Sequence, residues 1–284
     1  MLVGSKDMQI ETVTLKNGVS MPLLGMGTFS INKWALSSLI RNATKLGVRS
    51  IDTASAYHNE AWTGLGLKLS PVKRRDLFVT TKLSNGQQRN GDVEKALKLS
   101  LLKLGTRYVD LYLMHWPQTG TYLECWKQME ALYEKGYARA IGVCNFHQHH
   151  FDELFKIADV KPMVNQVELH PLLTQKELIR YCRGHEIQVE AYSPLARMHD
   201  DLINNKVLVD LAYRYRKSVV QIVLRWNYQN RVPVIPKSNQ IERIAENLSI
   251  INFDLQDTEM LEIDGINKNM RVRHDPDNCD FSKL

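Results

Sequence analysis

The chain has 284 residues, of which 44% are hydrophobic and 24% are charged, and its formal net charge is +6. These values are ordinary for a folded protein and exclude an intrinsically disordered chain. The basic residues are spread along the sequence, which excludes the basic stripe of a nucleic-acid-binding protein. The densest cluster, Lys73-Arg74-Arg75, is predicted to be a solvated loop. A modest positive surplus also suits an anionic cofactor.

The segment MLVGSKDMQIETV at the start does not have the pattern of a signal peptide. No apolar run approaches the roughly 18 residues that a membrane span needs. The four cysteines could form two disulfides, but a chain of this size does not need them, and no two have the C-x-x-C spacing of a metal or redox site. We therefore expect a cytoplasmic protein that binds neither nucleic acid nor membranes. The cysteines are Cys125, Cys144, Cys182 and Cys279.

The first predicted element is a β-hairpin. Residues Thr12–Lys16 alternate between polar and apolar side chains, Asn17-Gly18 supplies a turn, and Val19–Pro22 returns. Asn-Gly tolerates the positive φ angles of a type I′ turn, so we expect that turn here.

Eight short apolar runs follow, separated by longer helical stretches. The runs show little alternation, which is typical of parallel strands that are buried on both faces. The predicted strands are Leu23–Gly27, Arg49–Thr53, Leu77–Leu83, Val109–His115, Arg139–Cys144, Met163–Glu168, Gln188–Tyr192 and Val232–Ile235.

Local signals support the helices between these runs. Thr174-x-x-Glu177 and Ser218-x-x-Gln221 have the pattern of capping boxes at helix starts. Four glycines stand where helices should end. They are Gly47, Gly105, Gly136 and Gly184.

Eightfold alternation of strand and helix predicts an α/β fold of the (β/α)8 TIM barrel type, with the hairpin at its N-terminus. We see no linker or internal repeat, so residues 1–284 are predicted to form one domain. The rival is a doubly wound sheet that binds a dinucleotide through G-x-G-x-x-G. Gly25-Met26-Gly27 continues to Ser30 instead of a third glycine, and Gly64-Leu65-Gly66 continues to Leu69.

Polar side chains stand at the ends of the predicted strands, where a barrel of this type builds its chemistry. Strands two, three and four lead to Asp52, Lys82 and His115. Each alone has an ordinary structural explanation, such as a cap or a satisfied core histidine. An acid, a base and an imidazole on one rim together indicate an active site.

At these residues the sequence resembles the aldo-keto reductase superfamily, and the resemblance spans nearly the whole chain. The matching segments are GMGTF at 25–29, IDTASAYHNE at 51–60, TTKL at 80–83, LYLMHWP at 111–117, AIGVCNF at 140–146, NQVELHP at 165–171, EAYSPL at 190–195 and VIPKSNQIERIAEN at 234–247. Near the C-terminus, NKNMRVRHDPDNCDF resembles the microbial branch that contains 2,5-diketo-gluconate reductases and prostaglandin F synthases.

The resemblance implies a catalytic tetrad of Asp52, Tyr57, Lys82 and His115. Reduction of a carbonyl adds hydride to carbon and a proton to oxygen, and Tyr57 is the expected proton donor. A free tyrosine has a pKa near ~10, which a nearby ammonium would lower, so Lys82 is expected to lower it and Asp52 to hold Lys82. His115 is expected to orient the substrate oxygen.

The resemblance also implies NADPH as the cofactor, bound without a metal. The expected contacts are Gly27, Thr28, Phe29 and Asp52 at the first two strands; Asn145 and Gln166 on the carboxamide; Tyr192 stacked on the nicotinamide; Ser193 and Leu195 at the pyrophosphate; Pro236, Lys237, Ser238 and Arg243 around the 2′-phosphate; and Asn247 at the adenine. Cations and a hydroxyl around a phosphate make strong charge-assisted contacts, which favours NADPH over NADH.

Cys144 departs from the family, which usually has a serine at this position. A thiol is a weaker hydrogen-bond partner, so it could loosen the grip on the carboxamide or be a point of oxidation, although a plain core residue is favoured. His147-Gln148-His149-His150 could suggest a metal site. No carboxylate or cysteine is spaced to complete it, and a solvated helix start is favoured.

Phe29, Tyr57, His115 and Trp116 are expected to line the substrate pocket, with Trp62 as a further candidate. The segment Gln118–Thr121 is short, which predicts an open, shallow pocket and activity on small aldehydes, α-keto carbonyls and dicarbonyls. We expect a monomer. Two other functions stay open: a non-catalytic NADPH-binding subunit, which has no need of the tetrad, and a metal-dependent barrel hydrolase, which needs more His and Asp ligands than the strand ends offer.

Overall fold

The computed structural model of the protein describes residues 10–283. Its centre is a parallel sheet that, within the described residues, contains seven strands in sequence order from β3 to β9. Their bounds are β3 (Met26–Gly27), β4 (Ser50–Asp52), β5 (Phe78–Leu83), β6 (Leu111–Met114), β7 (Ile141–Cys144), β8 (Val164–Glu168) and β9 (Gln188–Tyr192). Each lies inside the range predicted from the sequence, and β9 matches its predicted range. The segment at residues 1–9, on which the signal-peptide prediction partly rests, lies outside the described residues.

The eighth predicted strand, Val232–Ile235, forms bridges instead of a ladder. Val234 pairs with Leu24 on one side and with Ala191 on the other, so it joins the first and last strands of the sheet and closes the barrel. Pro233 and Pro236 flank this pairing, and proline has no N–H to donate to a ladder. The predicted (β/α)8 barrel is therefore confirmed, with an eighth position that is shorter than the sequence suggests.

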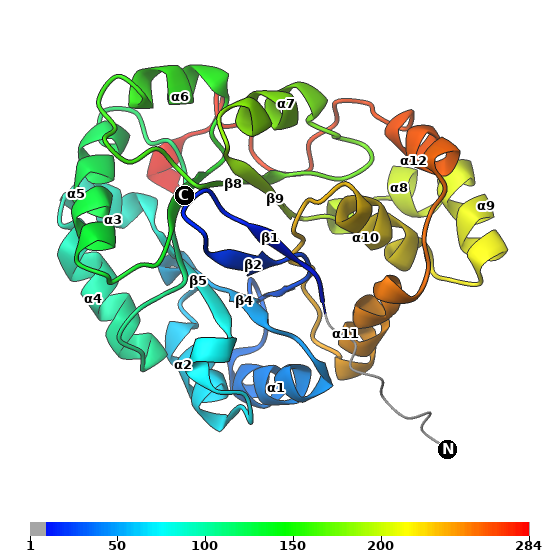
Figure 1. Ribbon diagram of the computed structural model, residues 1–284, viewed down its shortest axis with the longest axis horizontal. Coiled ribbons are helices and arrows are strands. Elements are labelled where there is room, and N and C mark those ends of the chain that lie inside the picture. The colour runs from blue at the N-terminus through cyan, green and yellow to red at the C-terminus, as the bar shows by residue number, and fades with distance from the viewer. Residues whose placement is uncertain (1–9, 284) are drawn as a thin grey trace.

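The N-terminal hairpin consists of β1 (Thr12–Thr14) and β2 (Ser20–Pro22), which pair antiparallel and lie across the centre of the ring of strands (Figure 1). Asn17 donates a side-chain hydrogen bond of 2.9 Å to the carbonyl of Arg139, just before β7 begins. The hairpin thus covers the N-terminal end of the barrel and leaves the carboxyl end for chemistry.

The turn of this hairpin differs from the expected type I′. Only Gly18 has a positive φ in the loop, and its N–H donates to the carbonyl of Leu15 at 2.8 Å. Lys16 and Asn17 therefore form the centre of an ordinary turn, and Gly18 follows in the left-handed conformation, which is the three-residue hairpin loop. The strands are correspondingly shorter than predicted.

Helices surround the barrel (Figure 1). Their bounds are α1 (Lys33–Leu46), α2 (Glu60–Leu69), α3 (Asn85–Asn90), α4 (Val93–Leu104), α5 (Tyr122–Glu134), α6 (Gln148–Leu154), α7 (Lys176–Gly184), α8 (Asp200–Ile203), α9 (Lys206–Tyr215), α10 (Val219–Gln229), α11 (Ile241–Leu248) and α12 (Asp257–Asp264). Among the described residues, no helix is both long enough and apolar enough to cross a membrane.

Most of the predicted helix signals are confirmed. Ser218 and Gln221 form a capping box at the start of α10, and Gly47 and Gly105 cap α1 and α4 in the left-handed conformation. Gly136 follows the cap of α5 with a φ of 76°.

The capping box predicted for α7 is wrong. Gln175 precedes this helix with a φ of 52°, so Thr174 lies one residue too early to cap it with Glu177. The N–H of Thr174 instead donates to Asn267. The helix ends at Gly184, as predicted, and His185 follows as its cap residue.

The residues after α12 return across the carboxyl end of the barrel, and we call residues 271–283 the C-terminal strap. The N–H groups of Val272 and Arg273 donate to the buried Glu168 carboxylate at 2.6 and 3.1 Å. Farther along, the carbonyl of Phe281, at the start of η5 (Phe281–Lys283), accepts from Arg89 of α3. The strap is thus attached on both sides of the barrel mouth.

Candidate active site

The four side chains predicted as a tetrad meet at the carboxyl end of the barrel. Lys82 of β5 is fully buried, and its Nζ lies 2.5 Å from Oδ1 of Asp52 at the end of β4. The same Nζ donates to the carbonyl of Thr53 at 3.0 Å and lies 3.3 Å from Oη of Tyr57. Tyr57 ends the short helix η1 (Ser55–Tyr57), and its ring centre is 5.7 Å from that of His115.

Parallel strands explain this convergence. Asp52 pairs with Thr80 and Lys82 with Leu113, so both functional side chains leave the sheet near its carboxyl edge. His115 follows β6 directly, and its N–H donates to the carbonyl of Leu83. Ser55 at the start of η1 donates to the carbonyl of Lys82, which holds the Tyr57 helix against β5.

Burial dominates the ionisation of these groups. It raises the pKa of Tyr57 to about 12, although the neighbouring Lys82 acts to lower it and Asp52 adds to the rise. Lys82 acts to lower the pKa of Tyr57, as predicted. The net shift is nevertheless upward, because desolvation of the phenolate outweighs the effect of Lys82. The phenol is therefore protonated throughout the physiological pH range.

The same surroundings raise the pKa of Lys82 and lower the pKa of His115. Burial lowers the pKa of Lys82, but Asp52 and Tyr57 together raise it above its usual range, so the ammonium keeps its charge. Burial, Lys82 and Arg273 lower the pKa of His115 to about 3. The imidazole is therefore neutral and carries one N–H.

Glu190 is a buried acid near Asp52 that we did not predict from the sequence. Nε2 of Gln166 donates to Asp52 at 2.9 Å and to Glu190 at 2.7 Å. Burial and the nearby Asp52 raise the pKa of Glu190 to about 8, so it carries a proton at neutral pH. Glu190 lies in the middle of β9, and only the closed barrel brings it toward Asp52.

A cavity of about 560 Å³ is lined by Asp52, Tyr57 and His115, while Lys82 is buried behind them. Its walls include most of the residues expected to bind the cofactor and the substrate: Gly27, Phe29, Asp52, Tyr57, His115, Trp116, Asn145, Gln166, Tyr192, Ser193, Leu195, Pro236, Lys237 and Arg243. Thr28, Ser238 and Asn247 do not line it. Thr28 is fully buried and its hydroxyl oxygen has no partner, while Ser238 hydrogen-bonds to the backbone of Gln240.

Three cations at this cavity fit an anionic ligand. Arg197, Lys237 and Arg243 all line it, and none forms an ion pair with any residue from 10 to 283. Positive side chains without a carboxylate partner are suited to phosphate groups, which bind Arg and Lys through charge-assisted hydrogen bonds. The donor set of this cavity thus fits a phosphorylated dinucleotide.

Comparison with known proteins agrees with the geometry. Residues 23–268 match the profile of the Aldo/keto reductase family. The chain belongs to this family. It is therefore an NADPH-dependent oxidoreductase that acts on carbonyl compounds.

Individual members are similar over nearly the full chain. The glyoxal reductase of Bacillus subtilis (strain 168) is 47% identical over 272 residues, which are 95% of this chain and 98% of that protein. The methylglyoxal reductase DkgA of Escherichia coli (strain K12) is 42% identical, over 93% of this chain and 96% of that protein. The crystal structure of a Bombyx mori aldo-keto reductase in complex with NADP has a TM-score of 0.88, with 34% identity, and covers 95% of this chain and 96% of the other.

In this aldo/keto reductase, the two amides expected to hold the carboxamide already have protein partners. Asn145 donates to the carbonyl of His115 at 3.0 Å and accepts from Oη of Tyr192 at 2.8 Å. Cys144 is 1% exposed, with its Sγ 4.0 Å from Oε1 of Gln166, and burial raises the pKa of its thiol. A protonated, buried thiol resists oxidation, which supports the structural interpretation of Cys144.

The strap contributes Arg273 to the wall of the reductase's cavity. The Trp116 ring lies beside His274 and Phe281, with ring centres 6.3 and 6.5 Å away. The segment before α5 is short, as expected, but the strap adds a wall that this loop would not provide. Trp62 is not at the cavity: it lies against Trp34 and Lys33 near α1, so its prediction as a pocket residue is wrong.

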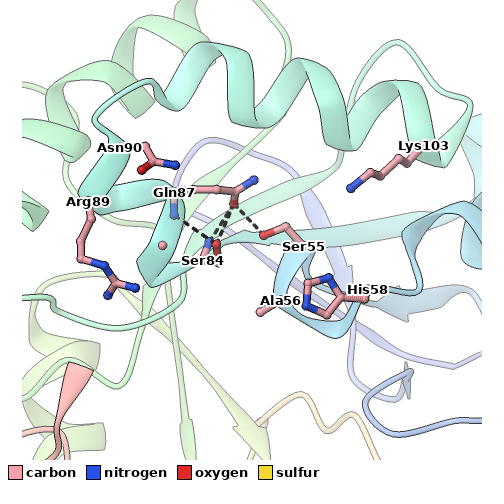
Figure 2. A pocket seen from close by; sticks show the side chains of 9 residues that line it. Ser55, Ala56, His58, Ser84, Gln87, Arg89, Asn90 and Lys103 are labelled. Carbon is pink, nitrogen blue, oxygen red and sulfur yellow. Dashed lines mark hydrogen bonds between the residues drawn. The ribbon is translucent and has the colours of Figure 1, made fainter. Parts of the chain in front are cut away.

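A second cavity, of about 550 Å³, lies behind η1 and beside α3. Figure 2 shows Gln87 accepting hydrogen bonds from Ser55 and Ser84 in its wall. None of the four tetrad side chains lines it. Its polar groups serve mainly to hold η1 and α3 together, so the reacting groups belong to the other cavity.

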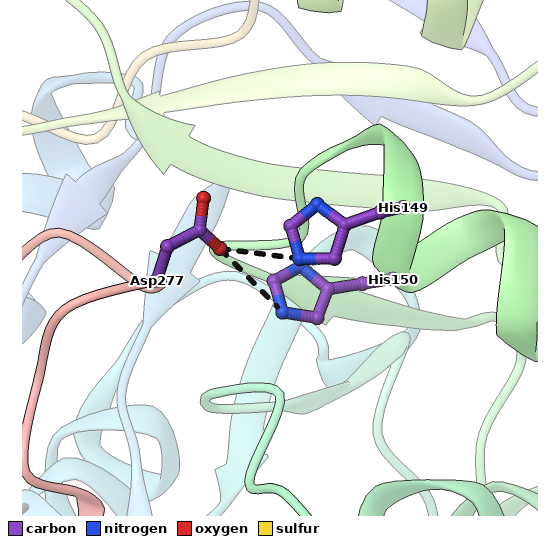
Figure 3. A group of neighbouring side chains, drawn as sticks. All are labelled: His149, His150 and Asp277. Carbon is purple, nitrogen blue, oxygen red and sulfur yellow. Dashed lines mark ion pairs between the residues drawn. The ribbon is translucent and has the colours of Figure 1, made fainter.

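The histidine cluster opens α6, as expected, with His147 as the residue before the helix. We expected no carboxylate to complete the cluster, and this is wrong, because the strap brings Asp277 to within 2.7 Å of His147 Nδ1 and 3.2 Å of His149 Nε2. Figure 3 shows the Asp277 carboxylate beside His149 and His150. Asp277 is 127 residues from His150 in the chain, so the spacing of residues near the histidines could not have predicted this contact.

The hydrogen bonds of this cluster assign its protons. The backbone N–H of His147 donates to Nδ1 of the His150 ring, and the Arg271 side chain donates to Nε2 of the His147 ring. An imidazole that accepts at one nitrogen carries its proton on the other, so Nδ1 of His147 and Nε2 of His150, which both face Asp277, carry hydrogen. The cluster thus holds the strap to α6.

Proposed function

We propose that this protein reduces small aldehydes, α-keto carbonyls and dicarbonyls to alcohols with NADPH, and that Tyr57 is the general acid. The observation that carries the assignment is the 3.3 Å approach of Lys82 Nζ to the Tyr57 hydroxyl, in the same cavity as His115. A phenol, an ammonium and an imidazole around one space can accept a carbonyl oxygen and protonate it.

The protonation states assign each side chain a role. Tyr57 keeps its proton because its pKa is raised, and it donates that proton to the oxygen that becomes the alcohol. Lys82 stabilises the phenolate that remains, and Asp52 balances the lysine's charge and fixes its Nζ. His115 is neutral and orients the substrate oxygen through its N–H. NADPH, when bound, supplies the hydride.

The cofactor residues remain those inferred from the sequence. Asn145 and Gln166 are proposed to hold the carboxamide and Tyr192 to stack on the ring, with Ser193 and Leu195 at the pyrophosphate. Lys237, Ser238 and Arg243 are proposed to hold the 2′-phosphate, with Pro236 beside them and Asn247 at the adenine. Gly27 and Phe29 are proposed to line the nicotinamide side, with the buried Thr28 between them in the chain. The unpaired cations at the cavity support this proposal.

Similarity to a glyoxal reductase and a methylglyoxal reductase supports small dicarbonyl compounds as substrates. The cavity of about 560 Å³ must hold both the cofactor's reactive end and the substrate, which also favours small molecules. We further propose a single domain over residues 1–284, a monomer and a cytoplasmic location.

The test is a panel of glyoxal, methylglyoxal, simple aldehydes and simple ketones with NADPH, followed by the loss of absorbance at 340 nm. We expect turnover of the dicarbonyls and short aldehydes. A parallel fluorescence titration measures the Kd for NADPH and NADH, and NADPH should bind more tightly. Tight NADPH binding without turnover of any panel member would favour the alternative, a non-catalytic NADPH-binding subunit.

A further inference from the structure

One cation at the active-site cavity is not used by the reaction described above. Arg273 belongs to the C-terminal strap and lines the cavity together with Tyr57, His115 and Trp116. Its guanidinium carbon lies 5.6 Å from the centre of the Phe29 ring, and that ring is 5.0 Å from the ring of Tyr57. The charge therefore lies one aromatic ring away from the proposed proton donor.

The position of Arg273 is fixed by its neighbours in the strap. Its own N–H donates to the buried carboxylate of Glu168, and the next residue, His274, packs beside Trp116. Arg271, two residues earlier, is held by His147. These contacts hold the backbone of Arg273 at the barrel mouth, and the Phe29 ring is the neighbour of its guanidinium.

The guanidinium has no protein counter-charge. Within residues 10–283, Arg273 takes part in no ion pair and its side chain donates no hydrogen bond. Glu168 accepts from two backbone N–H groups and lies 3.0 Å from His170, and the Arg273 guanidinium forms no ion pair with it. Five N–H donors are thus left for a ligand, and their planar fork matches a carboxylate.

A second polar group in the same cavity is also without a partner. Asn85, at the start of α3, is 1% exposed, and neither its Nδ2 nor its Oδ1 has a hydrogen-bond partner in the described chain. A buried amide without partners is unfavourable unless a ligand or water satisfies it. The substrate region therefore offers a cation and an amide in addition to the groups that act on the carbonyl.

We propose that Arg273 recognises a carboxylate on the substrate, so that the preferred substrates are carbonyl compounds that also carry an acid group, such as oxo acids and aldehyde acids. Asn85 is a further polar contact for the oxygen atoms of such a molecule. The inference rests on the proposed function, since it names a substrate class for the same site. It adds a property that neutral dicarbonyls do not share.

The experiment compares 4-oxobutanoate with its neutral methyl ester, both at saturating NADPH. The wild-type kcat/KM should favour the acid. Arg273→Gln should lower kcat/KM for the acid by about 10- to 100-fold, the range for loss of a hydrogen bond to a charged group, and leave the ester within about twofold. Arg273→Lys keeps the positive charge but loses the planar fork of N–H donors. Its kcat/KM for the acid should lie between the values for the wild type and Arg273→Gln.

Arg41→Gln is the matched control, because Arg41 is an exposed arginine on α1 without an ion pair in the described chain. It removes the same net charge away from the cavity and should change neither substrate's kcat/KM. An equal loss for the acid in both variants would mean general charge steering and overturn the proposal.

Three other results would also overturn it. Equal losses on acid and ester in Arg273→Gln would mean that the residue only shapes the pocket. A weakened Kd for NADPH that accounts for the whole loss would mean that Arg273 serves the cofactor. Reduction of the ester by every variant, with no preference for the acid, would end this inference while the proposed function stands.

Discussion

Lys82 depends strongly on its neighbours, because a fully buried ammonium needs a counter-charge. Asp52 supplies it at 2.5 Å, and the carbonyl of Thr53 takes a second hydrogen. Removing one partner of a buried ion pair leaves the other charge unpaired, which is strongly destabilising. A loss of activity at either position can therefore reflect a loss of folding, and the two effects must be separated.

A double variant separates them. Lys82→Met alone should abolish reduction and also lower the unfolding free energy, by about 3–5 kcal/mol if Asp52 stays ionised. Lys82→Met with Asp52→Asn should recover most of that stability, because no charge is left unpaired, but no activity. Thermal unfolding and the assay at 340 nm measure the two effects. Activity that returns with stability would show that Lys82 has a structural role only.

The residues of the candidate site differ in how far the sequence predicts them. Asp52, Lys82 and His115 follow successive parallel strands, whose carboxyl ends meet at one rim, so their convergence is predictable from strand order. Glu190 and Arg273 are not predictable in this way. The first faces Asp52 only when the barrel closes, and the second reaches the cavity because the strap crosses the mouth.

At the scale of elements, strand and helix order was predictable and the closing pair was not. Short apolar runs between caps identify the strands, as the match at β9 illustrates. Pro233 and Pro236 remove ladder donors from the eighth run, so its pairing depends on Leu24 and Ala191, which are distant in the sequence. The Thr174 capping box failed for a similar reason, because the backbone at Gln175 turns into the left-handed region.

Close packing of helices α2 and α4 depends on Gly64. A Cβ at this position would lie 2.5 Å from the carbonyl oxygen of Lys103 and 2.7 Å from the backbone of Leu104. Gly64→Ala should therefore push the helices apart and cost about 1–3 kcal/mol of unfolding free energy.

Gly86→Ala on α3 is the control for this prediction. Its added Cβ would meet only the end of the Arg89 side chain, at 3.8 Å. Removal of a glycine from a helix should leave its stability unchanged or raise it by up to about 1 kcal/mol. Urea unfolding of both variants measures the difference, and equal midpoints would contradict the packing account.

For the whole molecule, the buried Glu190 predicts how stability depends on pH. Its pKa is raised from 4.5 to about 8, so between these values the folded state binds its proton more tightly than the unfolded state does. The protonated Glu190 therefore contributes to the unfolding free energy, and this contribution is complete below pH 4.5. As the pH rises toward 8, the contribution is lost at a rate on the order of 1 kcal/mol per pH unit.

Glu190→Gln should remove this dependence, because an amide does not titrate and can still hydrogen-bond to Gln166. Unfolding at pH 5 and pH 8 should show a larger fall in stability for the wild type than for the variant. Parallel pH profiles in the two proteins would mean that Glu190 is ionised in the fold.

The central claim is that the Tyr57 hydroxyl protonates the substrate oxygen in a site that binds NADPH independently of that hydroxyl. Tyr57→Phe removes one oxygen atom and leaves the ring against Phe29 and His115. With a dicarbonyl substrate, we predict a fall in kcat on the order of 10²- to 10⁴-fold, with the Kd for NADPH within about twofold of the wild-type value. A variant that retains most of its kcat would show that another group supplies the proton.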